Sequence, residues 1–209
     1  SMSAPACLII GLENHFGAYL ARLLDMRGVG LAGIGNPHLL SRLGIADAIV
    51  PVPPTDAAAA ARAARLVFAV SDGTAARAEM IAESLASAAA ATVPPRIIHV
   101  ADAAALYSPI VRNTLRRFMR ARMGGGIETA NALLEAHDSR LGPPDSLLAS
   151  ITSAAWIAAK TDQSTASPMV IAEPGPRDWG WTPEYVDAVA RLSMRPTLID
   201  IVVASGHLL

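Results

Sequence analysis

Three residues near the start of the chain have the types and spacing of a phosphate-binding turn. Gly11 and Gly17 occupy the outer positions of a Gly-x-x-Gly-x-x-Gly pattern after the apolar run 7–10. In dinucleotide-binding folds such a turn holds a pyrophosphate against the N-terminus of a helix. The middle position is Asn14, whose side chain takes space that the pyrophosphate would need. The pattern predicts either cofactor binding weakened by Asn14 or a turn kept only as scaffold.

The end of the second predicted strand bears on the choice of cofactor. An acidic side chain at this position binds the adenosine ribose, and an arginine nearby accommodates a 2′-phosphate. Here the residues are Gly35, Asn36 and Pro37, which supply neither group. We therefore expect NAD(P) binding to be weak or absent, with NAD preferred over NADP if either binds.

Side chains able to exchange protons are spread along the chain. They are His15, His99, Tyr107, His137 and Asp138. No Gly-x-Ser-x-Gly turn, phosphate-loop lysine or cluster with metal-ligand spacing accompanies them. We predict no metal site, and a structural role is favoured for each isolated histidine.

Composition argues against several classes of partner. The 209 residues carry a formal net charge of -1 at pH 7, so there is no general attraction to nucleic acid or to an anionic membrane. No uncharged apolar run reaches the roughly 18 residues of a membrane span, and no basic segment precedes the first apolar run. The single cysteine, Cys7, is expected to be a core residue. These features predict a cytoplasmic protein.

Continuous apolar runs alternate with helical patterns through the first half of the chain. The predicted strands are residues 7–10, 29–34, 48–52, 66–70 and 97–100. The predicted helices begin near Phe16 and end at Gly28, cover 56–64 behind a Thr55 N-cap, and cover 74–91. This alternation predicts an α/β fold with a doubly wound parallel sheet and helices on both faces.

The second half is expected to continue the same domain. A helix over 108–123 carries a ridge of Arg112, Arg116 and Arg120, which suits a phosphate or acidic partner, a solvated face or the rim of a dimer. Residues 127–134 fit a helix or a strand by pattern alone. Further helices are predicted up to Lys160 and from Thr182, and strands over 168–172 and 198–203.

Several segments in the right order resemble one group of enzymes. They are Arg177-Asp178-Trp179-Gly180, the helix segment 184–188, the turn 11–24, Leu106-Tyr107, His137-Asp138-Ser139 and the closing strand 202–206. Together they resemble the GDP-mannose 4,6-dehydratases, of the extended short-chain dehydrogenase/reductase (NAD-dependent epimerase/dehydratase) family. The resemblance implies a Rossmann-like single domain, 1–107 being a nucleotide-binding-like half and 108–209 a second half. It also implies a strand over 127–134.

Departures from the family pattern fall on its proton-transfer residues. The resemblance places Ile110 at the catalytic tyrosine, Thr114 at the lysine that lowers the tyrosine pKa, and Ala105 at the glutamate, with Ala103 and Ala104 at the hydroxyl positions. Only Arg177 remains as an expected contact for a nucleotide-sugar diphosphate, and the resemblance implies that the C-terminal sugar-binding part is largely missing. We therefore expect a non-catalytic relative, a pseudoenzyme with no cofactor, serving as a binding or assembly module. The alternative is an active NAD(P)-dependent nucleotide-sugar dehydratase or epimerase with a non-standard site.

The resemblance also implies a homodimer. In the family, the helices matching 74–91 and 108–123 pack as a four-helix bundle between subunits. Here the first is rich in alanine, and the second adds an apolar ridge at Leu115 and Phe118 or Met119. We expect this surface to be buried against a second copy of the chain.

Overall fold

The computed structural model describes residues 5–103, 108–134 and 182–204. Its strands are β1 (Cys7–Ile10), β2 (Leu31–Ile34), β3 (Ile49–Pro51), β4 (Leu66–Val70), β5 (Arg96–Asp102), β6 (Thr129–Leu134) and β7 (Ile201–Val203). Its α-helices are α1 (His15–Met26), α2 (His38–Arg42), α3 (Ala57–Ala63), α4 (Ala75–Ala89), α5 (Pro109–Met123) and α7 (Thr182–Ser193). The strand predicted over 127–134 is present as β6, which begins two residues later, at Thr129.

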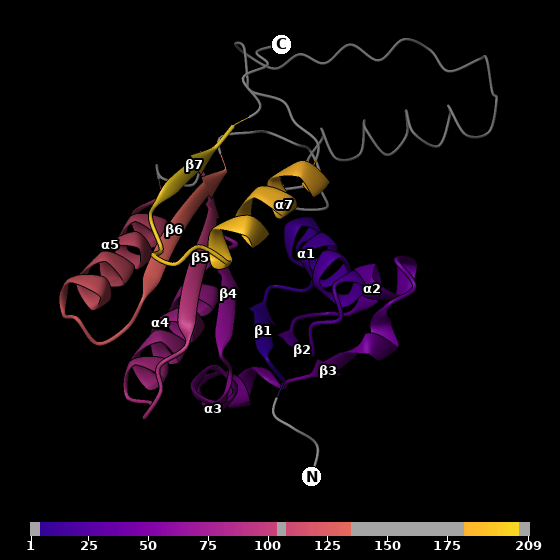
Figure 1. Ribbon diagram of the computed structural model, residues 1–209, viewed down its shortest axis with the longest axis horizontal. Helices are drawn as coiled ribbons and strands as arrows, with labels where there is room; N and C mark the ends of the chain where they lie inside the picture. The colour runs from indigo at the N-terminus through magenta and orange to yellow at the C-terminus, as the bar shows by residue number, and fades with distance from the viewer. Residues whose placement is uncertain (1–4, 104–107, 135–181, 205–209) are drawn as a thin grey trace.

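The strands form one parallel sheet in the order β3-β2-β1-β4-β5-β6-β7 (Figure 1). The order runs outward in both directions from β1, so the crossovers reverse between β1 and β4. This is the doubly wound Rossmann-like fold that the alternation of strands and helices predicts. The reversal leaves a crevice at the carboxyl ends of β1 and β4, where such folds place their ligands.

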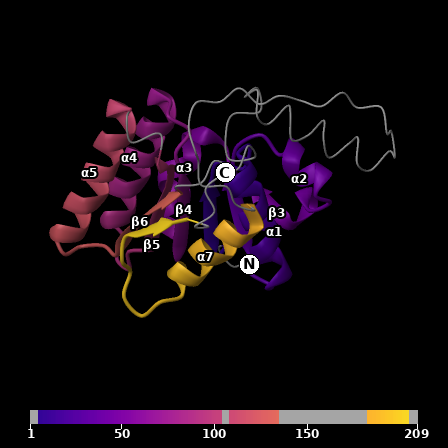
Figure 2. The same ribbon diagram turned by 90° about the horizontal axis from the view of Figure 1, so that it is seen from above.

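Two hydrophobic cores lie on the two faces of the sheet. Helices α1, α2 and α7 pack on one face, around Phe16, Phe68 and Val189. Helices α3, α4 and α5 pack on the other, around Ile81, Ile97 and Phe118. Figure 2 shows α4 and α5 side by side on one face and α7 across the sheet from them. Residues of β1 alternate between the two cores, which explains why its apolar run is continuous.

Helix α1 begins and ends where the sequence predicts. The side-chain oxygen of Asn14 accepts a hydrogen bond from the Phe16 N–H at 2.8 Å and so caps the N-terminus. At the other end Gly28 adopts a φ of +74°, and its N–H donates to the carbonyl of Asp25 at 2.8 Å. The Asn14 cap joins the turn 11–14 to the N-terminus of α1.

Two predicted boundaries are wrong for identifiable reasons. Thr55 does not cap a helix, because Pro54–Asp56 form a 3-10 turn and α3 begins only at Ala57, after Asp56. The strand predicted over 198–203 shortens to β7, because the carboxylate of Asp200 accepts the Asn131 N–H at 2.7 Å. The predicted helix ending at Lys160 and the strand 168–172 lie outside the described residues.

Cys7 and the described helices show neither a reactive thiol nor a membrane span. The Cys7 side chain is buried in β1, and burial raises the pKa of its thiol to about 12, so it is a core residue as expected. Among the described residues, no helix has both the length and the apolar character needed to cross a membrane.

Candidate functional site

The predicted glycine turn has the compact geometry of a phosphate-binding turn. Gly11 follows β1 with a φ of +115°, a conformation that L side chains rarely adopt. A Cβ on Gly17 would overlap the carbonyl oxygen of Gly11, so α1 can approach the turn this closely only with glycine at position 17. The two glycines therefore hold the N-terminus of α1 at the crevice, as the sequence predicts.

Asn14 changes what the N-terminus of α1 offers to a ligand. Helix N-termini bind phosphate through N–H groups that have no partner within the helix. Here the Asn14 side chain already accepts the Phe16 N–H. A pyrophosphate would therefore lose a donor as well as the space that a glycine leaves free.

An ion pair between Arg77 of α4 and Glu13 of the turn lies across the crevice. One guanidinium nitrogen donates to Glu13, and the other donates at 2.9 Å to the carbonyl of Val70, the last residue of β4. A Cβ on Gly11 would lie 2.9 Å from this second nitrogen, so the guanidinium lies against the end of β1. The Arg77 side chain is only 9% exposed. The pair therefore occupies the switch point between β1 and β4.

The Glu13 carboxylate extends from the pair toward the end of β2. Its Oε2 atom is buried and makes no hydrogen bond, and a Cβ on Gly35 would overlap this oxygen. A negative charge therefore lies between the glycine turn, which would hold the pyrophosphate, and the end of β2, where the adenosine ribose of a dinucleotide would lie. Burying an unpaired carboxylate oxygen beside a phosphate is unfavourable. Sequence patterns do not reveal the pairing of Glu13 with Arg77, because 64 positions separate the two residues along the chain.

A second polar arrangement crosses the sheet from the same edge. Ser71, directly after β4, places its Oγ 2.6 Å from Nε2 of His99 in β5. The Nδ1 atom of His99 lies 3.1 Å from the Asn131 side-chain oxygen in β6. Asn131 in turn donates to Asp200, which pairs with Arg122 at 2.8 Å. Burial lowers the pKa of His99 to about 4, against a smaller raising effect of the hydrogen bond to Asn131.

The residues at the family's proton-transfer positions offer no acid or base where they are described. Ile110 lies in the first turn of α5, and Thr114 is buried with its hydroxyl donating to the Ile110 carbonyl at 3.2 Å. Ala105 and Arg177 lie outside the described residues, as do Tyr107, His137 and Asp138. Among the described residues of the scattered set named from the sequence, His99 lies within hydrogen-bond distance of a potential nucleophile, the Ser71 hydroxyl.

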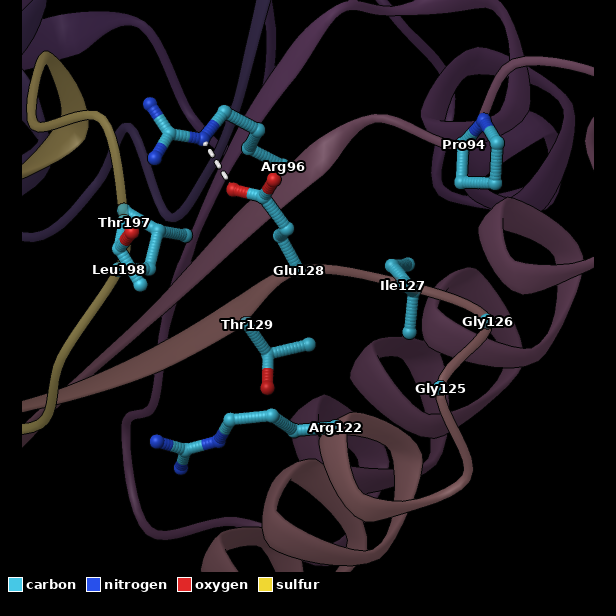
Figure 3. Close-up of a pocket in the computed structure, with 10 residues that line it drawn as sticks. All are labelled: Pro94, Arg96, Arg122, Gly125, Gly126, Ile127, Glu128, Thr129, Thr197 and Leu198. Atoms are coloured by element: carbon cyan, nitrogen blue, oxygen red, sulfur yellow. Dashed lines mark hydrogen bonds and ion pairs between the residues drawn. The ribbon is translucent and has the colours of Figure 1, made fainter.

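A pocket of about 460 Å³ lies at the opposite edge of the sheet, at the amino ends of β5 and β6 (Figure 3). Its two arginines are already paired: Arg96 with Glu128 at 2.8 Å and Arg122 with Asp200. Arg96 also donates to the backbone carbonyls of Ser193 and Arg195. This pocket lies away from the glycine turn and has no uncommitted cation. In the part of the chain that the structure describes, no group of three or more acidic, histidine or cysteine residues could hold a metal ion.

Comparison with known proteins supports the fold. Neither a scan against protein-family models nor a search of curated proteins gives a match. Among solved structures, dTDP-glucose 4,6-dehydratase from Streptomyces venezuelae with NAD bound is similar with a TM-score of 0.71 and 14% identity, over 97% of this chain and 76% of that one. A nucleoside-diphosphate-sugar epimerase from Pseudomonas aeruginosa gives 0.64 and 15%, over 97% and 72%. Triphenylmethane reductase from Citrobacter sp., in complex with NADP(H), gives 0.64 and 14%, over 98% and 71%. At these identities the likeness defines a Rossmann-like fold.

A dinucleotide is the cofactor that this fold implies, and the residues of the crevice do not fit it. The glycine turn and the close approach of α1 are present. Against them stand the cap by Asn14 and the buried, unpaired Oε2 atom of Glu13, and residues 35–37 themselves supply no acidic or basic side chain. The crevice thus has the backbone of a dinucleotide site with side chains that oppose its occupation.

Proposed function

We propose that this chain is a relative of NAD-dependent nucleotide-sugar dehydratases and epimerases that has lost their redox chemistry and serves as an assembly module. The observation that carries the proposal is the Glu13–Arg77 ion pair in the crevice. The guanidinium that could attract a pyrophosphate is neutralised by a carboxylate of the same chain, and that carboxylate repels phosphate. The fold therefore keeps its shape while the cofactor position is filled from within.

Residues on α5 support the loss of catalysis. Hydride chemistry in this family needs a tyrosine that takes a proton and a lysine that lowers its pKa. Ile110 has no titratable group, and the Thr114 hydroxyl is buried and bonded to the backbone of its own helix. Neither residue can transfer a proton to or from a sugar hydroxyl.

One observation favours the second candidate, an active NAD-dependent dehydratase or epimerase with a non-standard site. Glu13 Oε2 lies beside Gly35 at the end of β2, where an acidic side chain would accept hydrogen bonds from the adenosine ribose. In that case Glu13 would bind NAD rather than exclude it. The two functions make opposite predictions for the variant Glu13→Ala. This variant should lose NAD binding if the protein is an active dehydratase or epimerase, and should not lose it if the protein is an assembly module.

Incubation with GDP-mannose and NADP tests the loss of catalysis. We expect no 4-keto-6-deoxy sugar nucleotide, because Ile110 and Thr114 occupy the positions of the proton-transfer pair. The variant Ile110→Tyr should stay inactive as well, since Thr114 still occupies the lysine position. Detection of the keto product by mass spectrometry with the unaltered protein would overturn the proposal.

The assembly surface that we propose is the outer face of α4 and α5. On α4 the exposed side chains include Glu79, Glu83 and Ala86. On α5 they are mainly basic, namely Arg112, Arg116, Arg117 and Arg120. Met119 is 48% exposed beside half-buried Leu115, whereas Phe118 is fully buried in the core and does not contribute to the expected ridge. An acidic helix beside a basic one is self-complementary about a two-fold axis, which suits a homodimer.

A dimer through this face should be disrupted by Ala86→Arg. The arginine-rich helix α5 of the second copy would then face a new positive charge instead of a small side chain. We therefore expect a monomeric mass by light scattering at tens of micromolar. Ala88 is unsuitable for this test, because it is fully buried against the sheet. The matched control is Ser41→Arg, at an exposed position of α2 on the opposite face, which should stay dimeric. A monomeric mass for the unaltered protein would refute the dimer.

A further inference from the structure

The hydrogen-bonded series Ser71, His99, Asn131 and Asp200 has the arrangement of a nucleophile, a base and an orienting group. Ser71 is partly exposed at the carboxyl edge of the sheet. His99 and Asn131 lie deeper, 0% and 4% exposed, with the His99 ring stacked 4.9 Å from Phe118. A hydroxyl within hydrogen-bond reach of an imidazole that a third side chain orients is the signature of an activated nucleophile.

Asp200 determines the direction of every hydrogen bond in the series. A carboxylate only accepts hydrogen bonds, so the Asn131 atom 3.3 Å away must be its NH2 group. The Asn131 oxygen therefore faces His99, and Nδ1 of His99 must carry the proton that it donates. The remaining ring nitrogen, Nε2, has a lone pair and accepts from the Ser71 hydroxyl at 2.6 Å. The ion pair with Arg122 holds Asp200 in place.

His99 offers Nε2 as an acceptor at neutral pH. Because burial lowers its pKa to about 4, the ring is neutral near pH 7 and its Nε2 lone pair faces the Ser71 hydroxyl, although the same shift makes it a weaker base than an exposed histidine. Asn131 is then a positioning residue, which fixes the tautomer by accepting from Nδ1. Ser71 follows β4 at the same edge of the sheet as the crevice, whereas His99 and Asn131 lie within β5 and β6, and none of these residues lies on the proposed dimer face.

We propose that Ser71 is a nucleophile that takes up an acyl group from small, uncharged, activated esters. The Ser71 oxygen forms a bond to the carbonyl carbon while its proton passes to Nε2 of His99. The bond from that carbon to the ester oxygen breaks, and the leaving group takes the proton from Nε2. Water can then release the acyl group as a carboxylic acid through the same proton path. The neighbouring carboxylate of Asp72 disfavours anionic acyl groups.

The experiment uses p-nitrophenyl acetate as the acyl donor. We expect release of p-nitrophenolate and an acetyl group mapped to Ser71 by peptide mass spectrometry. Ser41 is an internal control, because it is exposed and its hydroxyl bonds only to the Pro37 carbonyl. Acetylation of Ser71 should exceed that of Ser41 by at least about tenfold.

Two variants separate activation from mere exposure. Ser71→Ala should abolish the adduct at this position, and His99→Gln, which keeps hydrogen-bonding groups but no base, should slow acetylation of Ser71 by about 100-fold. Equal labelling of Ser71 and Ser41 in the unaltered protein would overturn the proposal, and so would an unchanged rate in His99→Gln. The comparison within the unaltered protein decides the matter even if His99→Gln does not fold.

Discussion

Replacing Arg77 with methionine should lower the free energy of unfolding by about 3 kcal/mol, the lower end of the range for breaking a buried ion pair. The methionine fills similar volume, but the Glu13 carboxylate loses its ion-pair partner, and the Val70 carbonyl loses a donor. The lower end applies because the Glu13 side chain is 33% exposed and keeps part of its hydration. Urea denaturation followed by circular dichroism measures the change.

The double variant Glu13→Gln/Arg77→Met provides the control for this interpretation. Removing both charges leaves no buried ion without a partner, so the double variant should be more stable than Arg77→Met alone. Strictly additive losses would mean that the pair does not interact energetically. A loss below about 0.5 kcal/mol for Arg77→Met would place the guanidinium in solvent rather than in the crevice.

Acidification should destabilise the protein before most carboxylates titrate. The pKa of His99 is about 4 in the folded protein and near 6.5 once the chain unfolds. Between these values the unfolded chain binds a proton that the folded chain excludes, so stability falls as the pH falls below 6.5. The loss should reach about 2 kcal/mol at pH 5 and about 3 kcal/mol near pH 4.

His99→Gln isolates this effect, because glutamine does not titrate. His99 contacts Ser71, Asn131 and the ring of Phe118, and Asn131 in turn binds the carboxylate of Asp200. The variant should therefore show a much smaller loss between pH 7 and 5 in parallel urea titrations. If the unaltered protein and the variant lose the same stability over this interval, another group is responsible.

Most of the fold could be predicted because its determinants are local. The apolar runs of β1 and β4 are continuous in the sequence, and each is buried on both faces. Thr74 caps α4 by accepting the Arg77 N–H at 3.2 Å, three residues ahead, which is a signal within one turn. The Thr55 cap and the length of β7 were mispredicted, since they depend on a proline turn and on a bond from Asp200 to another strand.

Only the glycine turn of the candidate site could be predicted from the sequence. The glycine turn depends on residues within one short segment, so Gly11, Asn14 and Gly17 could be identified. The Ser71–His99 and His99–Asn131 contacts join residues 28 and 32 positions apart, and they exist only because of the register between β4, β5 and β6. Likewise, nothing in the alanine-rich segment around Arg77 indicates that its side chain reaches Glu13.

Titration calorimetry with NAD and NADP tests the central claim most directly. If the Glu13–Arg77 pair and Asn14 close the crevice, the unaltered protein should show no saturable binding up to about 1 mM of either dinucleotide, weaker than about -4 kcal/mol. Glu13→Ala should not reduce whatever weak binding exists. A dissociation constant in the micromolar range, about -8 kcal/mol, that is lost in Glu13→Ala would contradict the account and identify Glu13 as a cofactor ligand.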